Sequence, residues 1–348
     1  MRSSDLLATV SNPPNPFQSG YLDWEGAPPR VELQVYRDNS KEILSRNNSP
    51  DLSFRWSLNP YRGCMHGCAY CYARPTHNYL DLGAGTDFDR KIIVKFEAAK
   101  LLRRTFMKRS WQGELILFSG NTDCYQPLEA SYELTRACLK TCLEFRNPVS
   151  IITKSALVER DVDILAELAR ECGCFVTISI PFINQENARK VEPFAPSPQR
   201  RIKAIRKLSE AGIPVGVNVA PIIPGLNDQD IPGILEAARE AGATRAAHIM
   251  VRLPGPVLEV FGQRIKKAFP YRWEKIMRRI TEARNGEFNN HRFGDRMTGQ
   301  GKYWQAIQQL FQQSCQRLGY ESFNPVGQPE IKSRFRRPGE AKQLSLFE

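Results

Sequence analysis

The sequence of 348 residues lacks any run of 18 consecutive apolar residues, so no segment is long and apolar enough to span a membrane. Residues 1–30 also lack an apolar stretch that could act as a secretion signal. A dinucleotide-binding glycine fingerprint is missing too, because Phe88 stands where the third glycine after Gly83 and Gly85 would be. No internal repeat of fixed period is evident. We therefore expect a cytoplasmic protein without membrane contact.

Structural disulfides are not expected in this chain. Its nine cysteines occur without an export signal, which points to the reducing cytosol, where disulfides are rare. Each thiol is then a buried small hydrophobe, a metal ligand or a redox group.

The composition is that of an ordinary globular protein, with 41% hydrophobic and 25% charged residues. It excludes a mostly disordered chain, a collagen-like fibre and a small disulfide scaffold. The 49 Lys and Arg exceed the 37 Asp and Glu, for a net charge of +12. This surplus is a weak indication of a polyanionic partner such as nucleic acid, and solubility alone is the alternative explanation.

Short apolar runs rich in β-branched residues alternate with amphipathic stretches along most of the chain. The runs suit buried parallel strands, and they are 53–58, 92–94, 115–118, 149–152, 175–180, 215–220 and 246–251. Helical periodicity lies between them, for example over 158–171 and 231–241. Strand–helix repetition predicts an α/β fold with a parallel sheet, and six or seven units indicate an incomplete TIM-like barrel.

The chain divides into four predicted regions. Residues 1–50 form an irregular lead-in with several prolines, and residues 51–255 form the barrel. Residues 256–323 form a helical C-terminal extension, which includes one basic, aromatic-containing helix over 264–284 and a second helix over 302–318. Residues 324–348 form a Pro-, Gly- and Arg-rich tail that we expect to be extended and mobile.

The strongest chemical signal is a triplet of cysteines, Cys64, Cys68 and Cys71, directly after the first predicted strand. Gly63 and Gly67 allow the backbone to curl so that three thiolates converge. Three thiolates can bind three irons of a cubane cluster and leave the fourth iron open for a ligand.

Two other interpretations of the triplet stay open. A structural zinc site would need a fourth protein ligand, which His77 could supply but His66, between two of the cysteines, could not easily. Three unrelated buried cysteines would explain neither the glycines nor the position after a strand.

This Cys-x3-Cys-x2-Cys loop, with Tyr70 before its last cysteine, resembles that of the radical S-adenosylmethionine (SAM) superfamily. Four further segments resemble the branch of that superfamily around spore photoproduct lyase, the DNA-repair-photolyase-like proteins. These segments are 119–129, 153–155, 192–197 and 219–228. The resemblance covers roughly residues 50–255.

The resemblance implies a partial (β/α)6 barrel and a [4Fe-4S] cluster on the three cysteines. SAM would chelate the open iron, and an electron from an external reductant would release a 5′-deoxyadenosyl radical. The protein would contribute placement and the exclusion of water.

Barrel enzymes carry their sites on the loops after the strands, so the loop after 115–118 should face the cofactor. Its candidate contacts are Ser119, Gly120, Asn121, Thr122 and Asp123. The alternative role for this loop is helix capping by the threonine or the aspartate.

Three residues on other elements are further cofactor candidates: Tyr70 could pack on the adenine, and Ser179 and Asn218 could contact ribose or carboxylate. Lys154 could meet substrate or the cofactor carboxylate, or it is a surface lysine. Cys124 is a candidate catalytic residue, because a cysteine in the corresponding loop of spore photoproduct lyase returns a hydrogen atom to the product radical. Here that cysteine is shifted by a few residues.

The C-terminal region adds two signals for partners. Aromatic residues interleave with cations in the helix over 264–284, as in surfaces that bind nucleic acid, although a solvated helix with its aromatics in the core looks similar. The last residues resemble the motif by which bacterial repair proteins dock onto the DNA sliding clamp, and they are Gln343, Leu344, Ser345, Leu346 and Phe347. The alternative is a tail that packs on its own domain.

Three functional hypotheses follow. The first is a radical SAM enzyme that acts on DNA as a repair lyase does. The second is the same chemistry on a protein, an RNA or a small molecule. The third is a non-enzymatic iron–sulfur or zinc protein recruited by the clamp.

Overall fold

The computed structural model describes residues 32–321 and 333–338. Its main sheet has seven strands in the order β10-β9-β8-β7-β6-β3-β2. These strands are β2 (Leu44–Arg46), β3 (Trp56–Leu58), β6 (Ile116–Phe118), β7 (Val149–Thr153), β8 (Cys174–Ser179), β9 (Val215–Ile222) and β10 (Arg245–Met250). The six strands from β3 to β10 run parallel, and only β2 pairs antiparallel, at one edge.

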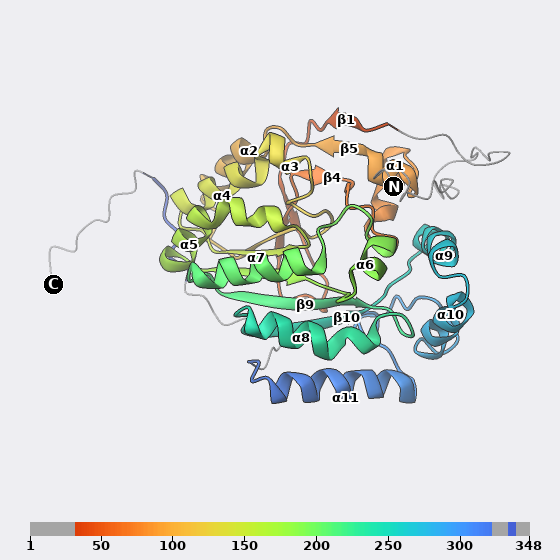
Figure 1. Cartoon of the computed structure of the whole chain (residues 1–348). Coiled ribbons are helices and arrows are strands. Elements are labelled where there is room, and N and C mark those ends of the chain that lie inside the picture. Colours follow the sequence, from red (N-terminus) through yellow and green to blue (C-terminus); the bar gives the residue numbers. More distant parts are fainter. Residues whose placement is uncertain (1–31, 322–332, 339–348) are drawn as a thin grey trace.

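Helices join the parallel strands and cover the outside of the sheet (Figure 1). They are α2 (Ala98–Phe106), α3 (Glu129–Tyr132), α4 (Leu134–Glu144), α5 (Val162–Glu171), α6 (Gln185–Val191), α7 (Pro198–Glu210) and α8 (Ile231–Glu240). The buried residues of β9 illustrate why the strands form: apart from Asn218 they are small or β-branched, as suits a strand that is covered on both faces. The predicted partial (β/α)6 barrel is confirmed.

Residues 92–94 form a buried strand as predicted, β5 (Lys91–Val94), which pairs parallel with β1 (Gln34–Arg37). Its predicted place in the barrel is wrong, because β5 lies in a separate three-stranded sheet with β1 and β4 (Tyr61–Arg62). The lead-in is also not irregular throughout, because β1 and β2 both lie within it. Their mostly exposed residues carry no apolar alternation that the sequence could reveal.

Two predicted helices are each divided. The amphipathic stretch 158–171 begins as a 3-10 helix, η3 (Ala156–Asp161), and continues as α5. The basic stretch 264–284 is part of two helices, α9 (Pro256–Ala268) and α10 (Trp273–Glu282), with Pro270 in the break. Proline fixes its own φ and lacks an N–H, so the helix ends before it. The remaining helices are η2 (Arg74–Leu80), α1 (Thr86–Arg90), η4 (Asp228–Asp230) and α11 (Gly301–Arg317).

The open side of the barrel, between its edge strands, is closed by residues 294–297. The Met297 carbonyl accepts a hydrogen bond from the N–H of Met250 on β10. Arg296 forms an ion pair with Asp51, in the turn between β2 and β3, and Gly294 N–H donates to the same carboxylate. We call these residues the seam segment, because they join both edges of the main sheet.

The tail differs from the prediction of mobility over its six described residues, 333–338. Phe335 lies beside Phe106 and Phe145, with ring centroids 5.7 and 6.1 Å apart. Arg337 donates hydrogen bonds to the carbonyls of Phe106, Lys108 and Trp111. In Figure 1 this blue segment lies at the α5 end of the molecule, while α9 lies beside α6 at the other end.

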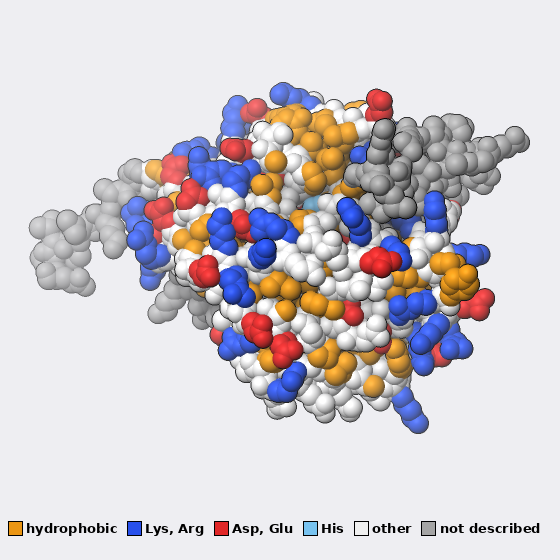
Figure 2. Space-filling model, in the orientation of Figure 1, with side chains coloured by type: hydrophobic (Ala, Val, Ile, Leu, Met, Phe, Trp, Pro, Cys, Tyr) orange, Lys and Arg blue, Asp and Glu red, His pale blue; other side chains and the backbone are white. Residues whose placement is uncertain are grey.

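The face of the molecule in Figure 2 carries Lys and Arg over several elements, with fewer acidic side chains between them. Within the described residues, no helix is long and apolar enough to cross a membrane.

Candidate cofactor site

The three cysteines of the triplet lie in one loop between β4 and η2. Gly63 has φ +81°, and a Cβ there would lie 2.9 Å from the carbonyl oxygen of Phe88. Gly67 has φ +66°. Both positions therefore favour glycine, because side-chain-bearing residues rarely adopt positive φ.

The three thiols are free and close enough to influence one another's ionisation. Cys64 and Cys68 are buried, and Cys71 is half-buried. Burial raises the pKa of Cys64, and the neighbouring Asp123, Cys68 and Cys71 raise it further. Burial and Glu192 raise the pKa of Cys68 to about 12. Thiolates at all three positions would repel each other, so this arrangement suits a bound cationic cluster with each sulfur on a different iron.

His77, the candidate fourth ligand of a zinc site, has one of its two ring nitrogens bound within the protein, while its Nδ1 is buried without a hydrogen-bond partner among the described residues. His77 Nε2 lies 2.9 Å from the Lys91 carbonyl oxygen and donates to it, and the ring packs edge-on to Phe88. Among residues 32–321 and 333–338, no group of three His, Cys, Asp or Glu side chains is arranged around a single metal ion.

A buried ion cluster supports the cysteine loop from behind. Arg74 Nη2 donates to the Cys68 carbonyl at 2.8 Å and to Asp89 at 2.8 Å. Arg264, on α9, donates to the Gly67 carbonyl at 2.6 Å and to the same aspartate at 2.5 Å. All three charged side chains are buried, so the loop backbone is held by two cations that share one anion.

The predicted cofactor loop after β6 is fixed by Asn59, a buried residue just after β3. Its Oδ1 accepts hydrogen bonds from the N–H groups of Asn121 and Thr122, at 3.0 and 3.1 Å. Ser119 has φ +78°, and its Oγ accepts from the N–H of Cys124. The loops after β3 and β6 are thus joined.

Asp123 binds protein neighbours with both carboxylate oxygens. Thr153 Oγ1 donates to Oδ1 at 2.6 Å, and the N–H of Lys154 donates to Oδ2 at 2.8 Å. His66 Nδ1, in the cysteine loop, lies 3.4 Å from Oδ2. Burial lowers the pKa of His66, against the opposing effect of Asp123. This carboxylate therefore connects the cysteine loop to the end of β7.

Tyr70 is held by a buried ion pair. Its hydroxyl donates to Glu192, which also accepts from Arg201 at 2.5 Å, and Lys154 Nζ lies 5.6 Å from the centre of the Tyr70 ring. Burial would raise the pKa of Glu192, but Arg201 and Lys154 outweigh it and lower that pKa. The carboxylate stays charged and fixes the tyrosine.

Ser179 and Asn218 lie side by side on β8 and β9, and both are buried. The Ser179 carbonyl accepts from Arg201, which links it to the Tyr70 cluster. Asn218 Oδ1 is buried and has no hydrogen-bond partner among the described residues. A buried amide oxygen without a donor suits a site that a polar ligand completes.

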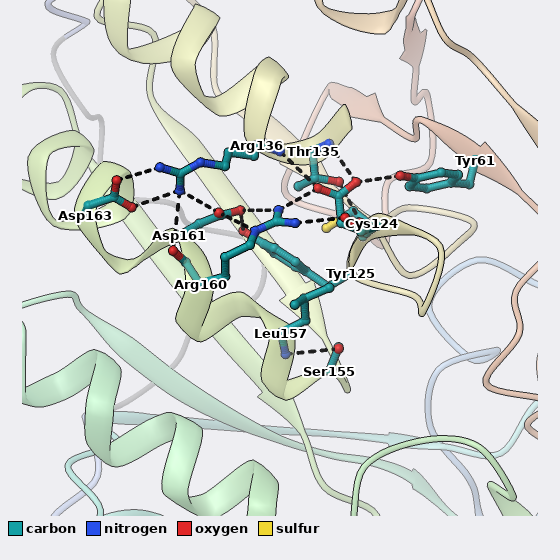
Figure 3. A network of polar contacts seen from close by, with 11 residues as sticks. Tyr61, Cys124, Tyr125, Thr135, Arg136, Ser155, Leu157, Arg160, Asp161 and Asp163 are labelled. Atoms are coloured by element: carbon teal, nitrogen blue, oxygen red, sulfur yellow. Dashed lines mark hydrogen bonds and ion pairs between the residues drawn. The ribbon is translucent and has the colours of Figure 1, made fainter. Parts of the chain in front are cut away.

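Cys124 is fully buried, and burial together with Asp123 raises its pKa. Figure 3 shows it beside a polar network in which Tyr61 donates to Glu129 at 2.5 Å. Arg160 bridges Glu129 and Asp161 in the same network. The network anchors the start of α4 and the end of η3, and so fixes the loop that carries Cys124.

Several supporting residues have no role that the sequence reveals. Asn59 and Glu192 lie in the recognised segments and Arg201 follows one of them, but each also bonds a residue on a distant element: Asn121, Tyr70 and Ser179, respectively. Gln126 is also buried and bonds Met65 N–H and the Gly63 carbonyl. The clamp-like residues 343–347 lie outside the described part of the chain.

The chain is similar to a known protein family and to several known proteins. The family profile described as the Radical SAM superfamily matches residues 58–238. An uncharacterised protein of Mycobacterium tuberculosis is 36% identical over 237 residues, which cover 67% of this chain and 70% of the relative. A protein of Pseudomonas phage M6 named radical SAM Nalpha-GlyT isomerase is 24% identical over 220 residues, 62% of this chain and 43% of that protein.

Solved structures of spore photoproduct lyase share the fold. The lyase complexed with a dinucleoside spore photoproduct aligns with a TM-score of 0.57 at 16% identity, over 86% of both chains. A variant of the lyase with bound AdoMet (SAM) and the same dinucleoside aligns with a TM-score of 0.56 at 17% identity, again over 86% of both chains.

Proposed function

We propose that this chain, which belongs to the radical SAM superfamily, is an enzyme that acts on DNA. Members of that superfamily are enzymes that use a [4Fe-4S] cluster and SAM. The cluster ligands of this chain would be Cys64, Cys68 and Cys71. Members of the superfamily also need an external reductant. The non-enzymatic hypothesis is set aside by this membership.

The observation that carries the DNA proposal is the extent of the likeness to spore photoproduct lyase. The superfamily profile ends at residue 238, whereas the lyase fold matches 86% of the chain. The match therefore includes elements outside the common domain. The net charge of +12 supports a polyanionic substrate as well.

The chain's own residues would bind and orient the cofactors. When bound, the cluster and SAM supply a 5′-deoxyadenosyl radical after one-electron reduction. Ser119, Gly120, Asn121 and Thr122 would present backbone and side-chain polar groups to SAM from the loop that Asn59 fixes. Asp123 would act within this loop by holding His66 and β7 in place.

Three more residues would complete the SAM pocket. Tyr70 would pack on the adenine while Glu192 holds its hydroxyl. Ser179 and Asn218 would contact ribose or carboxylate, and the unpartnered Asn218 Oδ1 supports this role. Burial of these side chains would exclude water from the radical.

Cys124 remains our proposed hydrogen-atom donor to the product radical. Its thiol is fully buried, so the loop 119–125 would have to move for the sulfur to reach a substrate. In a Cys124→Ala variant, 5′-deoxyadenosine should still form while the yield of the normal product falls. An unchanged product yield would exclude the role.

The same chemistry on another substrate is the alternative. A related protein from Granulibacter bethesdensis is named PqqA peptide cyclase. It is 31% identical over 97 residues, which are 28% of this chain and 25% of that protein. To decide, the reconstituted, reduced protein is given SAM with ultraviolet-irradiated DNA, intact DNA or no DNA. The DNA proposal predicts more 5′-deoxyadenosine with DNA, and equal amounts in all three reactions would contradict it.

We also propose that Gln343, Leu344, Ser345, Leu346 and Phe347 bind a bacterial sliding clamp. Their sequence would let an extended peptide place three apolar side chains in pockets of the partner. Removal of residues 343–347 should abolish clamp binding and leave the iron content unchanged. Undiminished binding by the truncated protein would contradict the proposal.

A further inference from the structure

Arg252 lies where the two edges of the parallel sheet meet. It follows β10, the last parallel strand, and its guanidinium carbon lies 5.7 Å from the ring centre of Tyr72. Tyr72 follows Cys71 directly, and its hydroxyl donates to the carbonyl of Gly120 in the loop after β6. Arg252 therefore stands at the ends of the strands, beside the cysteine loop and the proposed SAM loop.

The Arg252 guanidinium has almost no partner within the described residues. Its Nε is buried without an acceptor, and Nη1 has only a 3.9 Å contact with the sulfur of Met297. A half-buried guanidinium normally binds a carboxylate or several carbonyls, because its five donors are costly to leave unpaired. An anionic ligand would satisfy them.

Neighbouring charges increase the need for an anion. Burial, and to a smaller extent the neighbouring Arg252, lowers the pKa of Arg284 to about 10. Arg296 is the third cation, and it is paired with Asp51. Together, Arg252, Arg284, Arg296 and Asp51 carry three positive charges and one negative charge. Two positive charges thus remain beside the cysteine loop.

Two aromatic side chains flank these cations. Tyr72 is 50% exposed and Phe293, next to the seam segment, is 58% exposed. Arg296 lies over the Phe293 ring, 4.6 Å from its centre. Exposed aromatics beside arginines form stacking platforms for nucleotide bases, with the phosphates on the cations.

Helices α9 and α10, which contain the basic stretch 264–284, are less suited to binding nucleic acid than their sequence indicates. Arg264 is buried in the support of the cysteine loop, and Arg272 donates to the carbonyl of Gly225. Arg279 binds Glu282 and lies over the ring of Tyr303. These three cations already have partners within the protein.

We propose that Arg252, Tyr72 and Phe293 form a nucleotide subsite at the barrel seam, in which Arg252 binds a phosphodiester of single-stranded or unstacked DNA. This inference rests on the proposed function. A base must leave the duplex stack to reach an enclosed site, and a phosphate contact at the entrance would hold the strand there.

Salt-dependent binding tests the phosphate contact directly. Affinity of the reconstituted protein for a fluorescent single-stranded DNA oligonucleotide is measured by anisotropy over a range of salt concentrations. Arg252→Gln should weaken binding about tenfold at low salt and reduce the salt slope by about 0.7, the value for one phosphate contact on a single strand. Arg252→Lys, which keeps the charge, should restore most of the slope.

Arg245→Gln is the matched control. Arg245 is the first residue of β10, at the end of the strand far from Arg252, and it pairs with Glu321. It should leave affinity and slope unchanged. Phe293→Ala should weaken binding several-fold without a change in slope, because stacking does not depend on counterions. Iron content and thermal unfolding of every variant verify its folding.

The outcomes separate the subsite from the function. If the wild-type protein binds DNA and Arg252→Gln keeps its slope, the subsite is wrong while the DNA proposal stands. If the wild-type protein shows no binding to the oligonucleotide, the DNA proposal and the subsite are both overturned.

Discussion

Arg264 donates a 2.6 Å hydrogen bond to the carbonyl oxygen of Gly67, a residue 197 positions earlier in the chain. Gly67 lies within the cysteine loop, and Arg264 lies on α9, outside the barrel. The helical extension therefore takes part in shaping the proposed cluster site. Removing it would expose the loop and leave Asp89 with one cation fewer.

Substitution of Arg264 should destabilise this loop. In Arg264→Gln, the buried Asp89 loses one of its two guanidinium partners, and breaking a buried ion pair costs about 3 kcal/mol. Urea unfolding of the protein without a cluster should register this loss, and the iron bound after reconstitution should fall. Lys267→Gln, at an exposed position of the same helix, is the control. Equal stability of the two variants would contradict the account.

Asn59 should control the affinity for SAM. Asn59→Ala removes the oxygen that accepts from the N–H groups of Asn121 and Thr122, and each unsatisfied buried donor costs about 1–3 kcal/mol. Asn59→Asp keeps an acceptor at the same position. Equilibrium binding of SAM should therefore weaken at least tenfold in the alanine variant and much less in the aspartate variant. Equal affinities of the two variants would show that this acceptor does not shape the loop.

Stability should fall in mild acid because of His248. Burial lowers the pKa of His248 to about 4, against about 6.5 in an unfolded chain. As the pH falls from about 6.5 to about 4, the unfolded chain takes up a proton that the folded chain does not bind. Above that range His248 is neutral in both states, and it does not lower the free energy of unfolding. Below about pH 4 the free energy of unfolding is lower by roughly 3 kcal/mol.

The variant His248→Phe tests this dependence. The histidine ring lies 4.3 Å from the centre of Phe311 on α11, so an aromatic replacement keeps the packing. Urea unfolding at about pH 7 and about pH 5 should show a smaller difference in the variant than in the wild-type protein. The exposed His291→Gln should behave like the wild type. An undiminished pH effect in His248→Phe would assign the acid sensitivity elsewhere.

Residues 333–338 should stabilise the barrel. Phe335 is half-buried against Phe106 and Phe145, so Phe335→Ala should cost roughly 2 kcal/mol. A chain that ends at residue 332 should lose at least as much relative to a chain that ends at residue 338. Thermal unfolding compares the three. Equal melting temperatures of the two truncated chains would mean that the segment contributes no stability.

The sequence predicts the barrel well because its strands are short, β-branched and buried on both faces. Residues 92–94 have the same composition, yet they pair with β1 and β4, because composition does not specify a strand's neighbours. Pro270 does mark the end of α9 in the sequence, and a helix across it conflicts with the chemistry of proline.

The site is predicted only in part, for a different reason. The cysteine loop is recognisable because its ligands are close in sequence, with glycines at the positions of positive φ. The groups that support it come from distant elements. Asn59 accepts hydrogen bonds from Asn121 and Thr122, which lie 62 and 63 positions later in the chain, and Glu192 lies 122 positions after Tyr70. Only the fold brings such pairs together, so local patterns cannot reveal them.

We propose above all that Cys64, Cys68 and Cys71 hold a [4Fe-4S] cluster whose open iron binds SAM. The most direct measurement is electron paramagnetic resonance of the reduced protein after anaerobic reconstitution, with and without SAM. The wild-type protein and Cys138→Ala, which alters a buried cysteine of α4, should bind about four irons and show a signal that changes on SAM addition. Cys64→Ala should lose that signal. A Cys64→Ala variant that keeps the cluster and its response to SAM would contradict the claim.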